Sequence, residues 1–210
     1  MNARLEKLYR SGQFSKFLSQ VVECMGHGYP IGSEQYGLRN TLREELQRIE
    51  SGQPELAVAN LMNITRATQS PHAYLLLAAA NIKAEEWENA MTVLDILHCI
   101  EPDLPEANLL KGFVHGYFNR FGQGKSCLQA AVEQAPHLRL GWTALIEMAM
   151  AEGSNHEAAR FLTEALRADP RNMPLLQSQL GLLLDQPPVP HNEHLPLPCQ
   201  VEVLAEGCAR

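Results

Sequence analysis

Apolar and small residues recur along this chain at intervals of three and four positions, and the same pattern then returns at a fixed longer interval. Three sets of equivalent positions share this repeat: Leu97, Ala131 and Ala165; Leu94, Leu128 and Leu162; and Ala90, Gly124 and Ala158. Residues three and four positions apart lie on one face of an α-helix. The pattern therefore predicts helices over about residues 88–100, 124–134 and 156–168.

A second helical pattern precedes each of these segments. It covers residues 74–83, 108–117 and 142–150, and a short turn separates it from the helix that follows. The three units close on equally spaced prolines, Pro102, Pro136 and Pro170, which give a period of about 34 residues. Because proline disfavours helical backbone in the residue before it, these prolines predict where the second helices end. The fold is expected to be all-α, built from stacked helix-turn-helix repeats.

The repeat resembles that of the tetratricopeptide (TPR) family, in which an aromatic residue stands near position four, small residues at positions eight and twenty, and proline at position thirty-two. Position four holds Tyr74 and Trp142, and position eight holds Ala78 and Gly112. The second unit departs from the pattern, with Asn108 at position four. The resemblance implies a right-handed superhelix, or α-solenoid, in which the first helix of each pair lines a concave groove.

The same pattern divides the whole chain into units. Ser51-Gly52-Gln53 repeats Ser11-Gly12-Gln13, and each triplet lies between two helical patterns. The expected division is N-terminal helices with a possible degenerate repeat at 1–36, a degenerate helix pair at 37–70, full repeats at 71–104, 105–138 and 139–172, a capping helix at 173–185, and a proline-rich flexible tail at 186–210. A stack of such pairs needs a capping helix because its last apolar face would otherwise be exposed.

Charge and composition narrow the function further. The 210 residues carry a formal net charge of -7 with both signs mixed, so the chain has no basic surface for nucleic acid. No segment has the apolar length of a signal-peptide core or a membrane-spanning helix, and a cytoplasmic protein is expected. The five cysteines include no Cys-x-x-Cys pair and are expected to be reduced.

Motifs for catalysis and cofactor binding are missing from the sequence. It contains no glycine-rich phosphate loop, no Gly-x-Ser-x-Gly elbow and no His-Glu-x-x-His helix. His191 and His194 lie in the proline-rich tail, where no rigid frame would hold metal geometry. Residues 187–190 have the spacing of a polyproline ligand, which arises easily by chance. We expect a protein that is not an enzyme, with no cofactor and no metal site.

The resemblance to the TPR family also nominates groove residues, because particular positions of each first helix face the groove in that family. Here these positions are largely apolar, and the candidate partner-binding residues are Leu75, Ala79, Ile82, Leu109, Phe113, Tyr117, Thr143 and Met150. Family members that clamp a C-terminal carboxylate use lysine, asparagine and arginine in the groove. This chain has Leu75, Ala79, Leu140 and Ala144 at those places. Any one of the candidate side chains could instead pack against the next helix.

These features predict a protein-protein interaction module, an adaptor, scaffold or chaperone-like protein that holds an apolar peptide or amphipathic helix of another protein. One alternative resembles the type III secretion chaperones and predicts that the partner accumulates only in the presence of this chain. Another is a structural assembly subunit that docks by its convex face. A homo-oligomer formed through an incompletely capped N-terminal unit is a further option.

Overall fold

The computed structural model describes residue 10, residues 12–23 and residues 33–169. All of the regular structure within these residues is α-helical, which confirms the predicted fold class for this part of the chain. The helices are α2 (Gly12–Glu23), α3 (Ser33–Glu50), α4 (Pro54–Thr68), α5 (Pro71–Lys83), α6 (Trp87–Ile100), α7 (Pro105–Tyr117), α8 (Phe121–Gln134), α9 (Arg139–Ala151) and α10 (Asn155–Ala168). The capping helix and the proline-rich tail expected after residue 172 lie outside the described residues.

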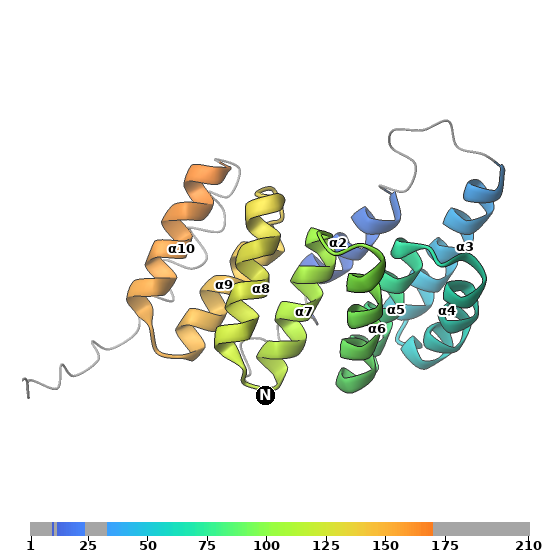
Figure 1. Cartoon of the computed structure of the whole chain (residues 1–210), viewed down its shortest axis with the longest axis horizontal. Coiled ribbons are helices and arrows are strands. Elements are labelled where there is room, and N and C mark those ends of the chain that lie inside the picture. Colours follow the sequence, from blue (N-terminus) through green and yellow to red (C-terminus); the bar gives the residue numbers. More distant parts are fainter. Residues whose placement is uncertain (1–9, 11, 24–32, 170–210) are drawn as a thin grey trace, which may run out of the picture.

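Neighbouring helices form four pairs: α3 with α4, α5 with α6, α7 with α8, and α9 with α10. Each pair also contacts the next one, because α4 packs on α5, α6 on α7 and α8 on α9. In Figure 1 the pairs follow one another along the long axis of the molecule, from α3 and α4 to α9 and α10. We call the side of α5, α7 and α9 that faces away from α6, α8 and α10 the inner face.

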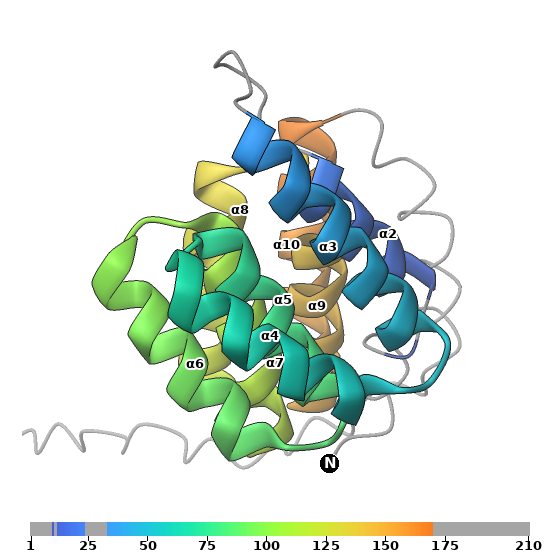
Figure 2. The same ribbon diagram turned by 90° about the vertical axis from the view of Figure 1, so that its right-hand side faces the viewer.

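Helix α2 takes no part in this stacking. It contacts α3, α5 and α9, and its Phe14 reaches Phe113 of α7. Figure 2 shows α6 and α2 on opposite sides of α5. The second helix of a stacked pair would touch only its own pair and the next one. We therefore describe α2 as a helix that crosses the inner face.

Prolines set the starts of three helices. Pro54, Pro71 and Pro105 are the first residues of α4, α5 and α7. Proline is tolerated in the first turn of a helix, because an amide there would have no intrahelical partner. For this reason α5 and α7 begin three residues earlier than the apolar pattern from residues 74 and 108 indicates.

The turns inside the three full pairs share one backbone conformation. Glu85, Asn119 and Gly153 occupy equivalent positions in the repeat and have positive φ values of 62°, 56° and 80°. After each of them, the next amide donates a hydrogen bond of 2.8 or 2.9 Å to the carbonyl five positions back. This is the Schellman arrangement that ends a helix. Gly52, with φ of 81°, makes the same turn between α3 and α4, so the first pair shares the repeat with a shift of one residue.

Two glycines allow α7 and α8 to approach closely in the second pair. A Cβ atom at Gly112 would lie 2.5 Å from Cγ of Leu128 and 3.3 Å from the backbone oxygen of Gly124. A Cβ atom at Gly124 would lie 2.8 Å from Sδ of Met148 on α9. The small-residue positions of the repeat therefore face each other within the pair, although Asn108 replaces the aromatic residue of the other units.

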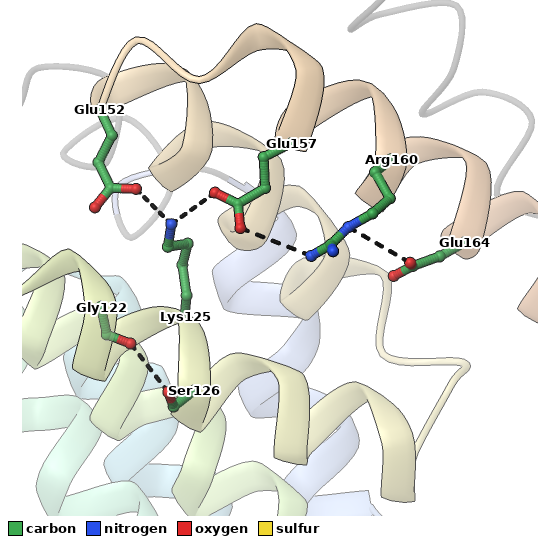
Figure 3. Close-up of polar contacts among 7 residues, drawn as sticks. All are labelled: Gly122, Lys125, Ser126, Glu152, Glu157, Arg160 and Glu164. Atoms are coloured by element: carbon green, nitrogen blue, oxygen red, sulfur yellow. Dashed lines mark hydrogen bonds and ion pairs between the residues drawn. The ribbon is translucent and has the colours of Figure 1, made fainter.

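An ion-pair network joins α8 to the last pair, as Figure 3 shows. Nζ of Lys125 lies 2.6 Å from Oε2 of Glu157 and also contacts Glu152 at the end of α9. Burial by itself lowers the pKa of Lys125, but the hydrogen bonds to Glu152 and Glu157 outweigh it and raise the pKa above 10.5. Because these carboxylates are partly exposed to solvent, we expect the network to orient the last two pairs and to stabilise them only modestly.

The contact between Gly112 and Gly124 gives a first prediction. Gly112→Ala should destabilise the protein by about 1–3 kcal/mol, because the added methyl group overpacks the buried contact with Leu128. Gly122→Ala in α8 is the matched control, since no atom lies within 4 Å of its Cβ position. The control should be neutral or stabilising by up to about 1 kcal/mol. Urea unfolding followed by helical circular dichroism measures both, and equal stability of the two variants would contradict the close approach.

Candidate partner-binding groove

The eight residues nominated from the sequence lie on three neighbouring first helices. Seven of them are buried, with at most 5% of their surface exposed, and Tyr117 is half-buried. They are Leu75, Ala79 and Ile82 on α5, Leu109, Phe113 and Tyr117 on α7, and Thr143 and Met150 on α9. The fold thus gathers the nominated residues in one region but leaves little of their surface open to solvent. That they bind a partner stays a prediction.

Helix α2 covers part of this region. Its buried side chains follow the spacing of one helical face and are Phe14, Phe17, Leu18, Val21 and Val22. The ring of Phe14 meets that of Phe113 edge to face, with centroids 5.8 Å apart and planes at 90°. Nζ of Lys83 lies 5.2 Å from the centroid of the Phe14 ring. Burial lowers the pKa of Lys83, and the positive charge of Arg10 lowers it further.

Helix α2 runs antiparallel to α7 and leaves space on one side. Phe14 contacts Phe113, whereas Val21, seven residues later, shares a cavity with Glu106, seven residues earlier. Two cavities, of about 390 and 230 Å³, lie between α2 and residues 137–140 at the start of α9. The side chain of Phe17 lines both of them. Helix α2 therefore fills part of the groove and leaves space beside the start of α9.

Ion pairs hold both ends of α2. Near its start, a guanidinium nitrogen of Arg10 lies 2.9 Å from Oε1 of Glu85 in the α5–α6 turn. At its end, the carboxylate of Glu23 pairs with Arg43, 2.6 Å away, and with Arg39, both on α3. The hydrogen bond from Arg43 is the largest influence on Glu23 and, with the charges of both arginines, holds the pKa of that carboxyl below 4.5. The pairs of Arg10 with Glu85 and of Arg43 with Glu23 are exposed, whereas the side chain of Arg39 is mostly buried. The exposed pairs direct the placement of α2, while its apolar face provides most of the attachment.

Tyr117 has a second role. Its ring stacks on that of Trp87, the first residue of α6, with centroids 4.1 Å apart and planes at 11°. It also meets the ring of Phe118 edge to face at 5.2 Å. At least one face of the Tyr117 ring therefore packs between two helix pairs. Such packing against another helix was the alternative given above for each candidate residue.

The repeat pattern of the sequence does not predict that α2 lies in the groove. Residues 1–36 were expected to hold N-terminal helices with a possible degenerate repeat, and the buried residues of α2 follow the three-and-four spacing of one helical face. The amphipathic character of α2 was therefore visible in the sequence. Its location was not, because Phe14 and Phe113 are distant in the chain and no local pattern links them.

A third cavity lies on the outer side of the stack, between α4 and α6 and next to α5. Its volume is about 390 Å³, and its lining includes Met62 and Ile96, which are 41% and 45% exposed. Asn81 of α5 also lines it and is only 2% exposed, and its Oδ1 has no hydrogen-bond partner among the described residues. An unsatisfied buried amide oxygen costs roughly 1–3 kcal/mol, so this cavity is a second candidate surface.

The described residues form no metal-binding cluster and present two cysteines. Within residues 10, 12–23 and 33–169, no group of three or more His, Cys, Asp and Glu side chains is placed to hold a metal ion. Cys99 is exposed, and Cys127 is half-buried, which raises the pKa of its thiol and makes it a weak nucleophile at neutral pH. None of the described helices is long and apolar enough to cross a membrane.

Comparison with solved structures finds neighbours of the same architecture. TTC0263, a thermophilic TPR protein in Thermus thermophilus, is 19% identical with a TM-score of 0.59, over 86% of this chain and 95% of its own. MamA 41-end from Desulfovibrio magneticus RS-1 is 21% identical with a TM-score of 0.57, over 73% of this chain and 85% of its own. Another MamA structure is 14% identical with a TM-score of 0.54, over 82% of this chain and 96% of its own.

These likenesses establish the fold: the chain is a stack of helix pairs of the TPR type. The sequence matches no protein-family model and no curated protein. At the identities found, the structural neighbours do not transfer a partner to this chain.

The ion pairs of Glu23 give a prediction with a defined sign. The pKa of Glu23 is lowered in the folded protein. Its ion pairs therefore stabilise the placement of α2 at pH values above 4.5, the ordinary pKa of a glutamate, and this stabilisation is lost as the pH falls through the lowered pKa. Arg43→Ala should move the pKa of Glu23 back towards 4.5, as measured by ¹³C NMR titration of its carboxyl carbon. Arg160→Ala on α10 is the matched control and should change nothing at Glu23. An unaltered pKa in the Arg43 variant would contradict the described pairing.

Proposed function

We propose that this chain is a protein-protein interaction module whose inner face binds an apolar peptide or amphipathic helix of another protein. The observation that supports this most is α2 itself. The inner face already holds an amphipathic helix, with Phe14 against Phe113 and Lys83 beside it. A surface whose shape and apolar character fit one such helix is suited to another of the same kind.

The chemistry of the groove favours binding by apolar area. Its nominated residues are mostly aliphatic or aromatic, and Leu140 and Ala144 stand on α9 where a carboxylate-clamping relative would carry cationic side chains. A partner segment is therefore expected to contribute large apolar side chains that become buried. The TPR fold is typical of interaction modules, and we propose a binding role without catalysis.

An adaptor or scaffold and a chaperone of the type III secretion kind would use this surface in the same way. They differ in what happens to the partner. The chaperone version, with the chain acting in the cytoplasm as we propose, predicts that the partner is degraded or aggregates when this chain is missing from the cell. An adaptor leaves the stability of its partner unchanged.

Site-specific photo-crosslinking in the native host tests the inner face. A benzoylphenylalanine replaces His137, which is exposed and lines both cavities beside α2, and in the control it replaces exposed Thr163 on α10. We expect one protein to crosslink from position 137 and not from position 163, because only the first position borders the groove. Crosslinking from position 163 alone would move the binding surface off the inner face.

The outer cavity supports a second candidate function, an assembly subunit that docks by its convex side. Exposed Met62 and Ile96 offer apolar area there, and Asn81 offers an acceptor without a partner among the described residues. If this surface is used, Met62→Glu with Ile96→Glu should remove a co-purifying partner. Leu56→Glu, at an apolar residue 59% exposed and outside the cavity lining, is the control and should retain it.

A further inference from the structure

We propose that α2 is a resident occupant of the inner groove, which a partner protein displaces with an amphipathic helix of the same pattern. The inference rests on the proposed function, since it concerns the regulation and the ligand of the same groove. The partner helix has a defined chemistry, and α2 must leave the groove before that helix binds.

The pattern of α2 defines the ligand. Its apolar residues stand at positions i, i+3, i+4, i+7 and i+8, from Phe14 to Val22. A basic residue, Arg10, lies four positions before the first of them, and an acidic residue, Glu23, follows the last. These charges match Glu85 at one end of the groove and the arginines of α3 at the other. A partner helix is expected to carry an aromatic residue for Phe113, with charges in the same order.

The way α2 is attached allows it to leave. Among the described residues, no backbone-to-backbone hydrogen bond joins α2 to another helix. The backbone carbonyl of Glu23 accepts a hydrogen bond of 2.9 Å from the side chain of Arg39, so the contacts that hold α2 involve side chains. Its release would leave no backbone amide of the stack without a partner. The ion pairs of Arg10 with Glu85 and of Glu23 with Arg43 join exposed side chains, which keep or regain water when they separate.

The buried side chains of α2 join the core of the stack, but much of that core lies between the stacked helices themselves. Within the pairs, Leu76 of α5, Leu94 of α6 and Leu128 of α8 are fully buried, and the Gly112 contact closes α7 on α8. What α2 covers is the inner face, including Phe113. Large exposed apolar patches promote aggregation, so an occupant that stays until a partner arrives protects this surface.

Competition between α2 and a ligand helix for the same groove makes a quantitative prediction. If a ligand binds only when α2 has left the groove, its apparent affinity is its intrinsic affinity multiplied by the fraction of molecules in which the groove is free. If α2 occupies the groove in all but roughly one to ten per cent of molecules, releasing it should strengthen binding by about 10- to 100-fold. No new contact between ligand and groove is required for this gain.

The test uses a fluorescein-labelled peptide with the sequence of residues 10–23 as probe and the full chain as receptor, measured by fluorescence anisotropy. Phe14→Glu with Leu18→Glu releases α2 by placing charges on its buried face. Gly12→Glu with Ser19→Glu adds the same charge at positions of α2 that are exposed or partly exposed and line neither cavity, and it is the matched control. We expect at least tenfold tighter binding by the release variant than by the wild type or the control, and loss of that gain when Phe113→Glu is added.

The outcomes separate this inference from the proposed function. If wild type and release variant bind the probe equally well, α2 does not compete for the groove and the inference fails, while helix binding by the groove stands. If no variant binds the probe, the groove takes no free helix and the proposed function fails with it.

A milder variant covers the case in which the release variant does not fold, which circular dichroism would show. Glu23→Gln removes the ion pairs at the end of α2 and leaves its apolar face intact, and the arginines of α3 stay available to the probe. It should bind the probe more tightly than wild type, though by less than the release variant would. Binding no tighter than that of wild type, in this folded variant, would overturn the inference.

Discussion

Burial of the first helices on both of their sides is the constraint on which the rest of the structure depends. In α5 all residues from Ala73 to Ile82 except Tyr74 are buried, and in α9 all residues from 140 to 150 are buried. A helix that is apolar around its whole circumference has to be covered on every side. The second helices cover one side, and α2 supplies part of the cover on the other. Removing it uncovers an apolar surface shaped for a helix, which links the fold to the function that we propose.

The fold was predictable because its determinants are local. Apolar spacing identified both helices of each pair, and the equally spaced prolines gave the repeat. The structure adds that Glu85, Asn119 and Gly153 repeat the same turn, a feature hidden from sequence reasoning because three different residues adopt it. Glycine adopts positive φ without strain, asparagine tolerates it, and glutamate does so only because the surrounding turn imposes it. Helices α5 and α7 begin a few residues before the apolar pattern predicts, because proline in the first turn extends a helix beyond its apolar residues.

The groove was predictable only in part. The family pattern placed Leu75, Phe113 and Met150 on first helices, where the structure has them, since position within a repeat fixes the helix. It could not show that these side chains are buried, because that depends on contacts between segments far apart in the chain, such as Phe14 and Phe113. Tyr117 illustrates the same limit: its stacking on Trp87 depends on how two pairs pack, which no local spacing encodes.

The central claim is that α2 is a separable helix on a stack that stands without it, and hydrogen-deuterium exchange of the full chain tests this most directly. Amides exchange either through local opening of their own element or only through global unfolding. The account predicts that the amides of α2 exchange by local opening, faster than those of α5 and α7, whose exchange requires the stack to unfold. Exchange of α2 at the same rate and with the same denaturant dependence as α7 would show that the two open together, and would contradict the claim.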